Sequence, residues 1–94
     1  MKPTLALSIS MKEDVLVQEL GGELVLLNLD SEEYFGLDTV GTSMWQALQE
    51  TGSIQATYDR LLGQYEVEPE QLKQDLLELI EKFVDHGLVE LSDS

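Results

Sequence analysis

The sequence contains no cysteine, a single histidine and a single tryptophan. The lack of cysteine excludes disulfides, thiol nucleophiles and thiolate metal sites. A histidine-based metal cluster needs more than one such residue, and a Ser-His-Asp triad would have to rely on His86. That residue stands beside Gly87 at the expected end of a helix, where a histidine is favourable to the helix dipole. We therefore predict no catalytic residue, no metal site and no cofactor.

Basic residues are also scarce: there are five, against nineteen acidic residues, and the formal net charge is −14. This charge repels phosphate backbones and anionic lipid headgroups, so neither nucleic acid nor a membrane surface is expected as a partner. No run is long enough to span a bilayer, and the start, MKPTLALSIS, lacks the apolar stretch of a signal peptide. We expect a cytoplasmic protein folded as one domain over residues 1–94.

Loops that bind phosphate or calcium are missing as well. Neither GxGxxG nor GxxxxGK[ST] occurs. The acidic stretch that begins at Asp30 suggests a calcium loop, but such a loop needs glycine at its sixth position and a bidentate acid at its twelfth. Those positions hold Phe35 and Gly41. A calcium site is therefore excluded.

The first half of the chain has the pattern of an antiparallel sheet. VLVQEL and ELVLLNL flank Gly21-Gly22, which is typical of a hairpin with strands at about 14–20 and 23–29. The second of these strands is apolar on both faces, so one face needs cover from something besides helices. We expect the segment of Leu5, Leu7 and Ile9, a strand or a flexible arm, to provide this cover.

A third short strand is predicted after the turn residues Asp30-Ser31-Glu32. It covers Glu33-Tyr34-Phe35-Gly36-Leu37, rich in aromatic and apolar side chains that favour strands. If Phe35 and Leu37 face the core, Tyr34 and Gly36 face outward.

The second half of the chain is predicted to be helical. Asp38 is a suitable cap for a helix over about 39–50, and Gly52 ends it. Ser53 caps a second helix, and Pro69 suits the first position of a third, which Gly87 closes. The tail, Leu88 to Leu91, is expected to be extended. The order of three strands and then three helices predicts an α+β, winged helix-turn-helix-like fold with a three-stranded antiparallel sheet.

The third helix has a wider apolar face than a surface helix needs. Its apolar residues span roughly 160° of the helix, against the ~100° stripe that packs one face. Part of this arc is therefore expected to be available to a partner. The apolar residues are Leu72, Leu76, Leu77, Leu79, Ile80, Phe83 and Val84.

Two binding classes fit the sequence poorly. A DNA-reading third helix needs net positive charge, yet this helix carries more acids than lysines. A carrier protein holds its phosphopantetheine arm on a serine of a DSL motif at a helix start. The only comparable pair, Asp30-Ser31, is followed by Glu32 and lies in a turn between expected strands. An acidic carrier protein therefore remains only a distant alternative.

Two stretches carry a resemblance to a known family. LVLLNLDSEEYFGLDTVGTSMWQAL and QYEVEPEQLKQDLLELIEKFVDHGLVE resemble the PqqD-like family, the recognition elements of ribosomally synthesised, post-translationally modified peptide (RiPP) pathways. The similarity runs from about Leu5 to Leu91. The sequence departs from the family pattern at Asp38, where asparagine is common, and at Glu68, where an aspartate usually caps the third helix.

The resemblance implies a fold that binds no DNA and holds the leader of a precursor peptide. The leader would add a strand to the third β-strand by β-augmentation and lay apolar side chains against the third helix. Asp75 would accept a hydrogen bond or pair with a leader lysine, and Lys73 would neutralise leader acids or simply extend into solvent. The peptide-binding residues this implies are Glu33, Tyr34, Phe35, Gly36, Leu37, Leu72, Lys73, Asp75, Leu76, Leu79 and Phe83.

Some of these residues have an equally good interpretation as ordinary core. Tyr34, Phe35, Leu76 and Phe83 belong to residue types that are usually buried in packed domains. Residues expected to be core in either case are Trp45, Leu48, Leu61 and Ile80.

The function that the resemblance implies is that of a non-catalytic adaptor. It would bind a leader peptide and deliver it to tailoring enzymes, most simply the leader peptidase and cyclase of lasso-peptide biosynthesis. The alternative is a peptide chaperone that presents a precursor to a radical-SAM enzyme, as in pyrroloquinoline quinone synthesis.

Overall fold

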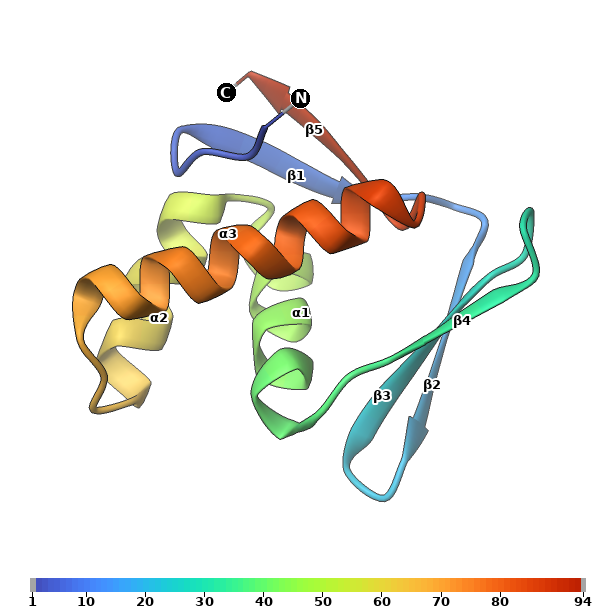
Figure 1. Cartoon of the computed structure of the whole chain (residues 1–94), viewed down its shortest axis with the longest axis horizontal. Helices are drawn as coiled ribbons and strands as arrows, with labels where there is room; N and C mark the ends of the chain where they lie inside the picture. Colours follow the sequence, from blue (N-terminus) through green and yellow to red (C-terminus); the bar gives the residue numbers. More distant parts are fainter. Residues whose placement is uncertain (1, 94) are drawn as a thin grey trace.

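The computed structural model describes residues 2–93 and has the predicted order of strands followed by helices (Figure 1). It confirms the α+β fold with a three-stranded antiparallel sheet and three helices, and adds a separate strand pair. The elements are β1 (Leu7–Met11), β2 (Val15–Leu20), β3 (Glu23–Asn28), β4 (Glu33–Gly36), α1 (Thr39–Thr51), α2 (Ile54–Gln64), α3 (Pro69–Asp85) and β5 (Val89–Asp93).

The larger sheet has the order β2-β3-β4, with antiparallel neighbours. Leu20 pairs with Glu23 across a two-residue turn, in which Gly21 and Gly22 have φ of 64° and 87°. These left-handed angles favour glycine, which has no Cβ to clash. The next pairing places Phe35 of β4 opposite Leu26 of β3.

The N-terminal segment does not cover the sheet, so that expectation is wrong. β1 pairs instead with β5 in a two-stranded antiparallel sheet, with Ile9 opposite Leu91. The Ile9 N–H donates to the Gly52 carbonyl at 3.0 Å, which ties β1 to the turn between α1 and α2 (Figure 1). Every residue of β1 pairs with β5, and the helices bury Leu7 and Ile9. β1 therefore has a hydrogen-bonded strand partner and a buried apolar face without contacting the larger sheet.

The core lies between the helices and the inner face of the β2-β3-β4 sheet. Trp45, Leu48, Leu61 and Ile80 are at most 1% exposed, which confirms them as core. The Trp45 and Phe83 rings pack edge to face with centroids 5.1 Å apart, a favoured aromatic geometry. This contact joins α1 to α3 within the core.

The helices begin where the caps were expected. The Asp38 carboxylate accepts from the Gly41 N–H at 2.7 Å, and the Ser53 hydroxyl accepts from the Ala56 N–H at 3.1 Å. Each bond satisfies one of the free amides at a helix start. Gly52, with φ of 65°, closes α1. The cap at Asp38 also fixes where β4 ends and α1 begins.

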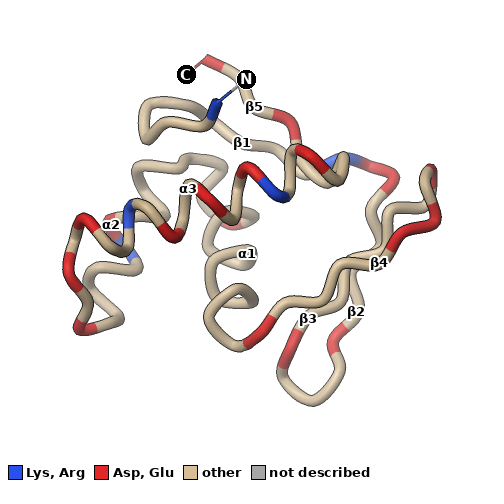
Figure 2. Tube along the Cα trace, viewed as in Figure 1, with Lys and Arg blue, Asp and Glu red and all other residues tan. Residues whose placement is uncertain are grey.

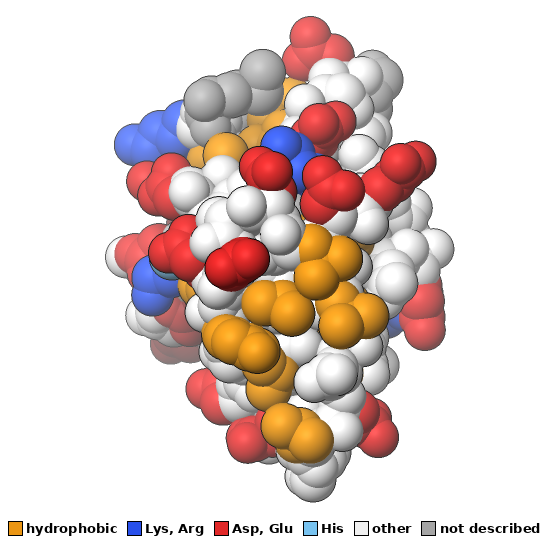
Figure 3. Space-filling model, turned by 90° about the vertical axis from the view of Figure 1, so that its right-hand side faces the viewer, with side chains coloured by type: hydrophobic (Ala, Val, Ile, Leu, Met, Phe, Trp, Pro, Cys, Tyr) orange, Lys and Arg blue, Asp and Glu red, His pale blue; other side chains and the backbone are white. Residues whose placement is uncertain are grey.

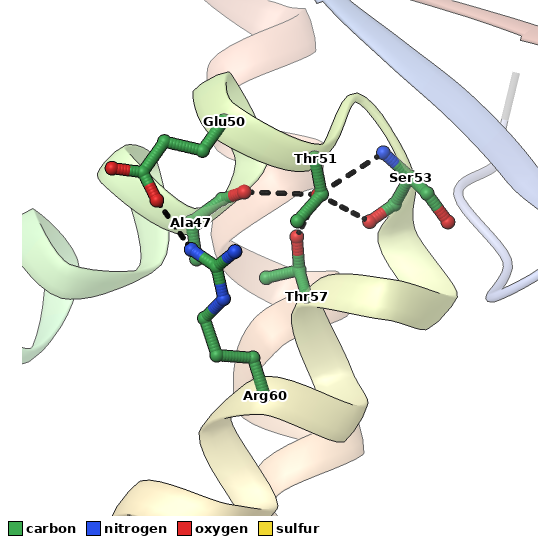
Figure 4. Close-up of polar contacts among 6 residues, drawn as sticks. All are labelled: Ala47, Glu50, Thr51, Ser53, Thr57 and Arg60. Atoms are coloured by element: carbon green, nitrogen blue, oxygen red, sulfur yellow. Dashed lines mark hydrogen bonds and ion pairs between the residues drawn. The ribbon is translucent and has the colours of Figure 1, made fainter.

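A hydrogen-bonded pair of threonines, half-buried Thr51 and buried Thr57, joins α1 to α2 across the turn between them (Figure 4). The Thr51 hydroxyl lies 2.9 Å from the Ala47 carbonyl, 2.9 Å from the Thr57 hydroxyl and 3.1 Å from the Ser53 carbonyl. Thr57 is fully buried, and Thr51 is its one side-chain partner in this network. Thr51 therefore provides the hydrogen bond that satisfies the buried Thr57 hydroxyl.

Replacing Thr51 by valine should lower the free energy of unfolding by about 1–3 kcal/mol, because the Thr57 hydroxyl would be left unpaired. The Thr51→Val, Thr57→Val double variant should lose less than the two single losses added together, since both partners are then apolar. Urea unfolding followed by Trp45 fluorescence measures this. Thr39→Val at an exposed position is the control, and an equal loss there would contradict the account.

Candidate functional site

The β4 strand has an open edge. The Leu37 N–H donates to the Leu24 carbonyl at 2.9 Å, and Leu37 thus continues the ladder toward β3. In an antiparallel ladder the bonding direction alternates along the strand, so Phe35 also bonds toward β3 while Tyr34 and Gly36 turn their backbone groups away. Within residues 2–93 no strand pairs with β4 on that side. The edge can therefore accept one further strand.

A groove lies between this edge and α3. Its volume is about 360 Å³. One wall comes from the end of β4 and the other from α3, while the start of α1 closes one end. The lining residues are Phe35, Gly36, Leu37 and Asp38 after β4, Val40, Gly41 and Met44 of α1, and Asp75, Glu78, Leu79 and Lys82 of α3.

Phe35 holds β4 against the end of α3. Its ring centroid lies 5.6 Å from that of Phe83 and 5.1 Å from that of His86, edge to face in both cases. Phe83 has no exposed surface, whereas Phe35 is half-buried and also lines the groove. Phe35 thus joins the core to the groove wall.

Asn28 makes the second tie between the sheet and α3. Its Nδ2 donates to the His86 carbonyl at 2.8 Å, and its Oδ1 accepts from the Asp30 N–H at 3.0 Å. The side chain is only 7% exposed, so these bonds are sheltered from water. A Cβ at Gly87 would lie only 3.0 Å from the same Nδ2, and φ there is 68°. Both the close approach and the left-handed backbone angle therefore favour glycine at this position. Asn28 thereby fixes the β3–β4 turn beside the end of α3.

The groove carries charged side chains that lack ion-pair partners among the described residues. Asp75 accepts from the Gln71 amide at 2.9 Å and Glu78 from the Gln74 amide at 3.1 Å. The ion pairs of the described chain lie elsewhere, at Lys12–Glu90 and Arg60–Glu50. Acidic residues also surround the rest of the molecule (Figure 2). The groove rim is therefore acidic except at Lys82.

The structure separates the predicted site residues into three groups. Phe35, Gly36, Leu37, Asp75 and Leu79 line the groove together. Leu72, Leu76 and Phe83 lie in the core with 5%, 0% and 0% exposure and support the groove from beneath. Glu33 and Tyr34 are exposed at the β4 edge, and Lys73 lines a separate hollow beside Glu70.

Five groove residues on helices were not among the predicted site residues: Val40, Gly41, Met44, Glu78 and Lys82. Val40 of α1 is 48% exposed and lines the groove, and the α3 residues Glu78 and Lys82 line its other wall. The sequence does contain a signal for Glu78 and Lys82, because they share one helix face with the predicted site residues Asp75 and Leu79. Val40 could not be found in this way, since its exposure depends on how α1 meets β4.

The outer face of the sheet is apolar and uncovered. Cross-strand pairing puts Leu16, Leu27 and Tyr34 in one row on this face. Figure 3 shows hydrophobic side chains gathered into a patch on this side of the molecule. We call the outer patch the set of Leu16, Leu20, Leu29 and Tyr34, which are 43%, 63%, 54% and 71% exposed.

Within residues 2–93 the structure has neither a metal-binding cluster nor a membrane-spanning helix. No cluster of three or more histidine, cysteine or acidic residues is arranged to hold a metal ion. No helix in this range has the length and apolar character needed to cross a membrane.

Comparison with known proteins identifies the family. The family model described as coenzyme PQQ synthesis protein D (PqqD) matches residues 23–89, well over half of the chain. The chain belongs to the PqqD family. The match spans β3, the groove and the start of β5, so the PqqD match includes every element that lines the groove. Among curated proteins none matches the sequence.

Two solved structures resemble this PqqD-family chain over most of its length. TbiB1 in complex with the TbiA(beta) leader peptide is 29% identical, with a TM-score of 0.80 over 85% of this chain and 93% of that one. Lasso peptide synthetase B1 complexed with the leader peptide is 23% identical, with a TM-score of 0.79 over 88% and 98% of the two chains. The second likeness shows the shared fold alone.

Changing Asn28 to aspartate should lower the free energy of unfolding by about 1–3 kcal/mol. The substitution keeps the acceptor for Asp30 but places a carboxylate oxygen against the His86 carbonyl, where a donor is needed. Urea unfolding measures the loss. Asp30→Asn, at an exposed neighbouring position, is the matched control. Stability within about 0.5 kcal/mol of the unchanged protein would contradict this role of Asn28.

Proposed function

We propose that this chain is a non-catalytic adaptor, one domain over residues 1–94, that binds the leader of a ribosomally made precursor peptide in the cytoplasm. The observation that carries the proposal is the open β4 edge beside a partly apolar groove. A bound peptide gains backbone hydrogen bonds from Tyr34 and Gly36 and places alternate side chains in the groove. Specificity comes from the few residues that enter it.

The more similar of the two structures supports leader binding, and the sequence resemblance favours lasso-peptide maturation as its setting. TbiB1, at 29% identity, is described in complex with a leader peptide, and the second similar chain is a lasso peptide synthetase B1 with its leader. The partners of this adaptor are then a leader peptidase and a cyclase. The family description favours one other candidate, presentation of a precursor to a radical-SAM enzyme of pyrroloquinoline quinone synthesis. Titration with each type of precursor distinguishes the two.

Delivery to an enzyme requires a second surface, and we assign the outer patch to the leader peptidase. Leu20 and Tyr34 are exposed there, and burying such side chains is favourable at about 25 cal/mol per Å². Two copies of this chain, each with a formal charge of −14, repel one another and are poor partners for that surface. The patch and the open edge belong to one sheet, so an enzyme on the patch lies close to the held peptide.

Replacing Gly36 by proline should weaken leader binding at least tenfold, because it removes an N–H that faces the open edge. The β3–β4 ladder is kept, since Gly36 does not bond toward β3. Isothermal titration with the synthetic leader of the precursor encoded in the same gene cluster measures the affinity.

Two control variants make the Gly36→Pro result specific. Gly36→Ala keeps the N–H, and its Cβ meets nothing within 4 Å, so binding should be unchanged. Glu19→Pro makes the same backbone change on β2, at the opposite edge of the sheet, and should also bind normally. Full affinity in Gly36→Pro would overturn the adaptor model.

The Leu16→Gln, Leu20→Gln double variant should leave leader affinity unchanged and slow leader cleavage by the peptidase about tenfold. Both residues lie on β2, away from the β4 edge, and both are exposed, so the fold should tolerate the change. Mass spectrometry of the cleaved leader measures the rate. A cleavage rate equal to that of the unchanged protein would refute the assignment of the outer patch.

A further inference from the structure

A hollow opens on the outer face of the sheet, at the end where β3 turns into β4. It has a volume of about 400 Å³ and is lined by Leu27, Leu29, Glu32 and Tyr34, and we call it the outer hollow. Leu27 and Tyr34 lie opposite each other across β3 and β4, so both side chains reach the hollow from the sheet. Leu29 and Tyr34 also belong to the outer patch, so the hollow forms one end of that surface.

The turn that carries Glu32 has a fixed shape. The Asp30 and Ser31 N–H groups donate to the Asn28 Oδ1 at 3.0 and 3.3 Å. The Glu32 N–H donates to the Asn28 carbonyl oxygen at 2.7 Å. These bonds set the position of Glu32 before any partner arrives, and a preformed site binds with little ordering of the protein.

The backbone at Glu32 suits glycine better than glutamate. Its φ is 60°, and within residues 2–93 it is the only residue other than glycine with a positive φ. Glycine adopts this left-handed angle at lower cost, so the glutamate side chain is not needed to form the turn. Its carboxylate has no ion-pair partner in the described chain, whose ion pairs are Lys12–Glu90 and Arg60–Glu50.

The lining of the outer hollow is complementary to an arginine side chain. The leucines offer apolar surface to an alkyl stem, Tyr34 presents an exposed ring, and Glu32 contributes a carboxylate. An arginine combines such a stem with a planar cation that stacks on aromatic rings and pairs with carboxylates, whereas a lysine ammonium is more strongly hydrated. The charged residues of this turn, Asp30, Glu32 and Glu33, are all acidic (Figure 2), so an acidic partner is repelled.

We propose that the outer hollow binds an arginine of the leader peptidase. The guanidinium lies against the Tyr34 ring and pairs with Glu32, while the alkyl stem covers Leu29. The inference rests on the proposed function, which assigns the outer patch to this enzyme, and deepens it by naming the side chain that the enzyme contributes. Because Tyr34 is part of β4, this anchor holds the enzyme beside the strand edge that takes the leader.

The test measures binding between the leader-bound adaptor and the leader peptidase encoded in the same gene cluster, by biolayer interferometry. Glu32→Gln keeps the size of the side chain and removes its charge, so it should weaken binding about three- to fivefold. Glu19→Gln makes the same charge change on the inner face of the sheet, opposite Leu24, and should bind as the unchanged protein does. Equal affinity of the two variants would overturn the anchor.

Charge reversal identifies the arginine. Each surface arginine of the peptidase is changed to glutamate in turn. One of these enzyme variants should bind the unchanged adaptor about tenfold more weakly and regain affinity with Glu32→Arg, but not with Glu19→Arg. If Glu32→Arg restores none of them, the anchor is wrong.

Glu32→Gly separates binding from folding. It should unfold at the same urea concentration as the unchanged protein or a higher one, because glycine suits φ of 60°, and should bind the enzyme at least as weakly as Glu32→Gln. A lower urea midpoint with unchanged enzyme affinity would show that Glu32 serves the fold and would overturn the proposal.

The possible failures differ from one another. If the Leu16→Gln, Leu20→Gln variant weakens enzyme binding while Glu32→Gln does not, the arginine anchor is wrong and the peptidase surface stands. If neither weakens it, the assignment of the outer patch falls together with the anchor. Leader affinity in Gly36→Pro decides the adaptor function separately.

Discussion

The link between the β3–β4 turn and the C-terminal end of α3 sets the shape of this molecule's functional side. Asn28 bonds to the carbonyl of His86, the residue that caps the end of α3, while Phe35 packs on Phe83 and His86. Only one end of β4 is tied to α3 in this way. Toward Gly36 the strand separates from the helix, and the groove lies in that space. A strand packed along its whole length would leave no room for a guest chain.

This arrangement gives the three sides of the β4 strand different environments. Phe35 and Leu37 face the core, the backbone of Tyr34 and Gly36 faces the open edge, and the Tyr34 side chain lies on the outer patch. Peptide capture and enzyme contact can therefore occur together, because they use different sides of one sheet. An enzyme on the outer patch would also meet the outward side chains of an added strand, since these continue the same face.

Local signals in the sequence predicted most of the elements, because their causes are local. The Gly21-Gly22 turn and the caps at Asp38 and Ser53 each depend on residues close in the chain. The pairing of β1 with β5 could not be predicted in this way, since it joins the two ends of the chain. Either end could have covered the sheet, and only the packed helices show why neither does.

The candidate site was predictable in its strand and less so in its helix. A sequence shows that α3 has a wide apolar face, but not which side meets the core. Leu76, Leu79 and Phe83 looked equivalent, yet Leu76 and Phe83 are fully buried while Leu79 lines the groove. The difference depends on the rotation of α3, which Trp45 and Phe35 set through their contacts with Phe83.

Charge acts on peptide binding at two ranges. The acidic surface around the molecule attracts any cationic peptide, and salt weakens that attraction beyond the Debye length of about 8 Å at physiological ionic strength. A contact with Asp75 at the groove acts at short range, where a bound peptide would displace much of the intervening water. High salt should therefore slow association more than it alters the choice among peptides. A peptide that pairs with Asp75 would be selected by the position of that carboxylate in the groove rather than by the net charge.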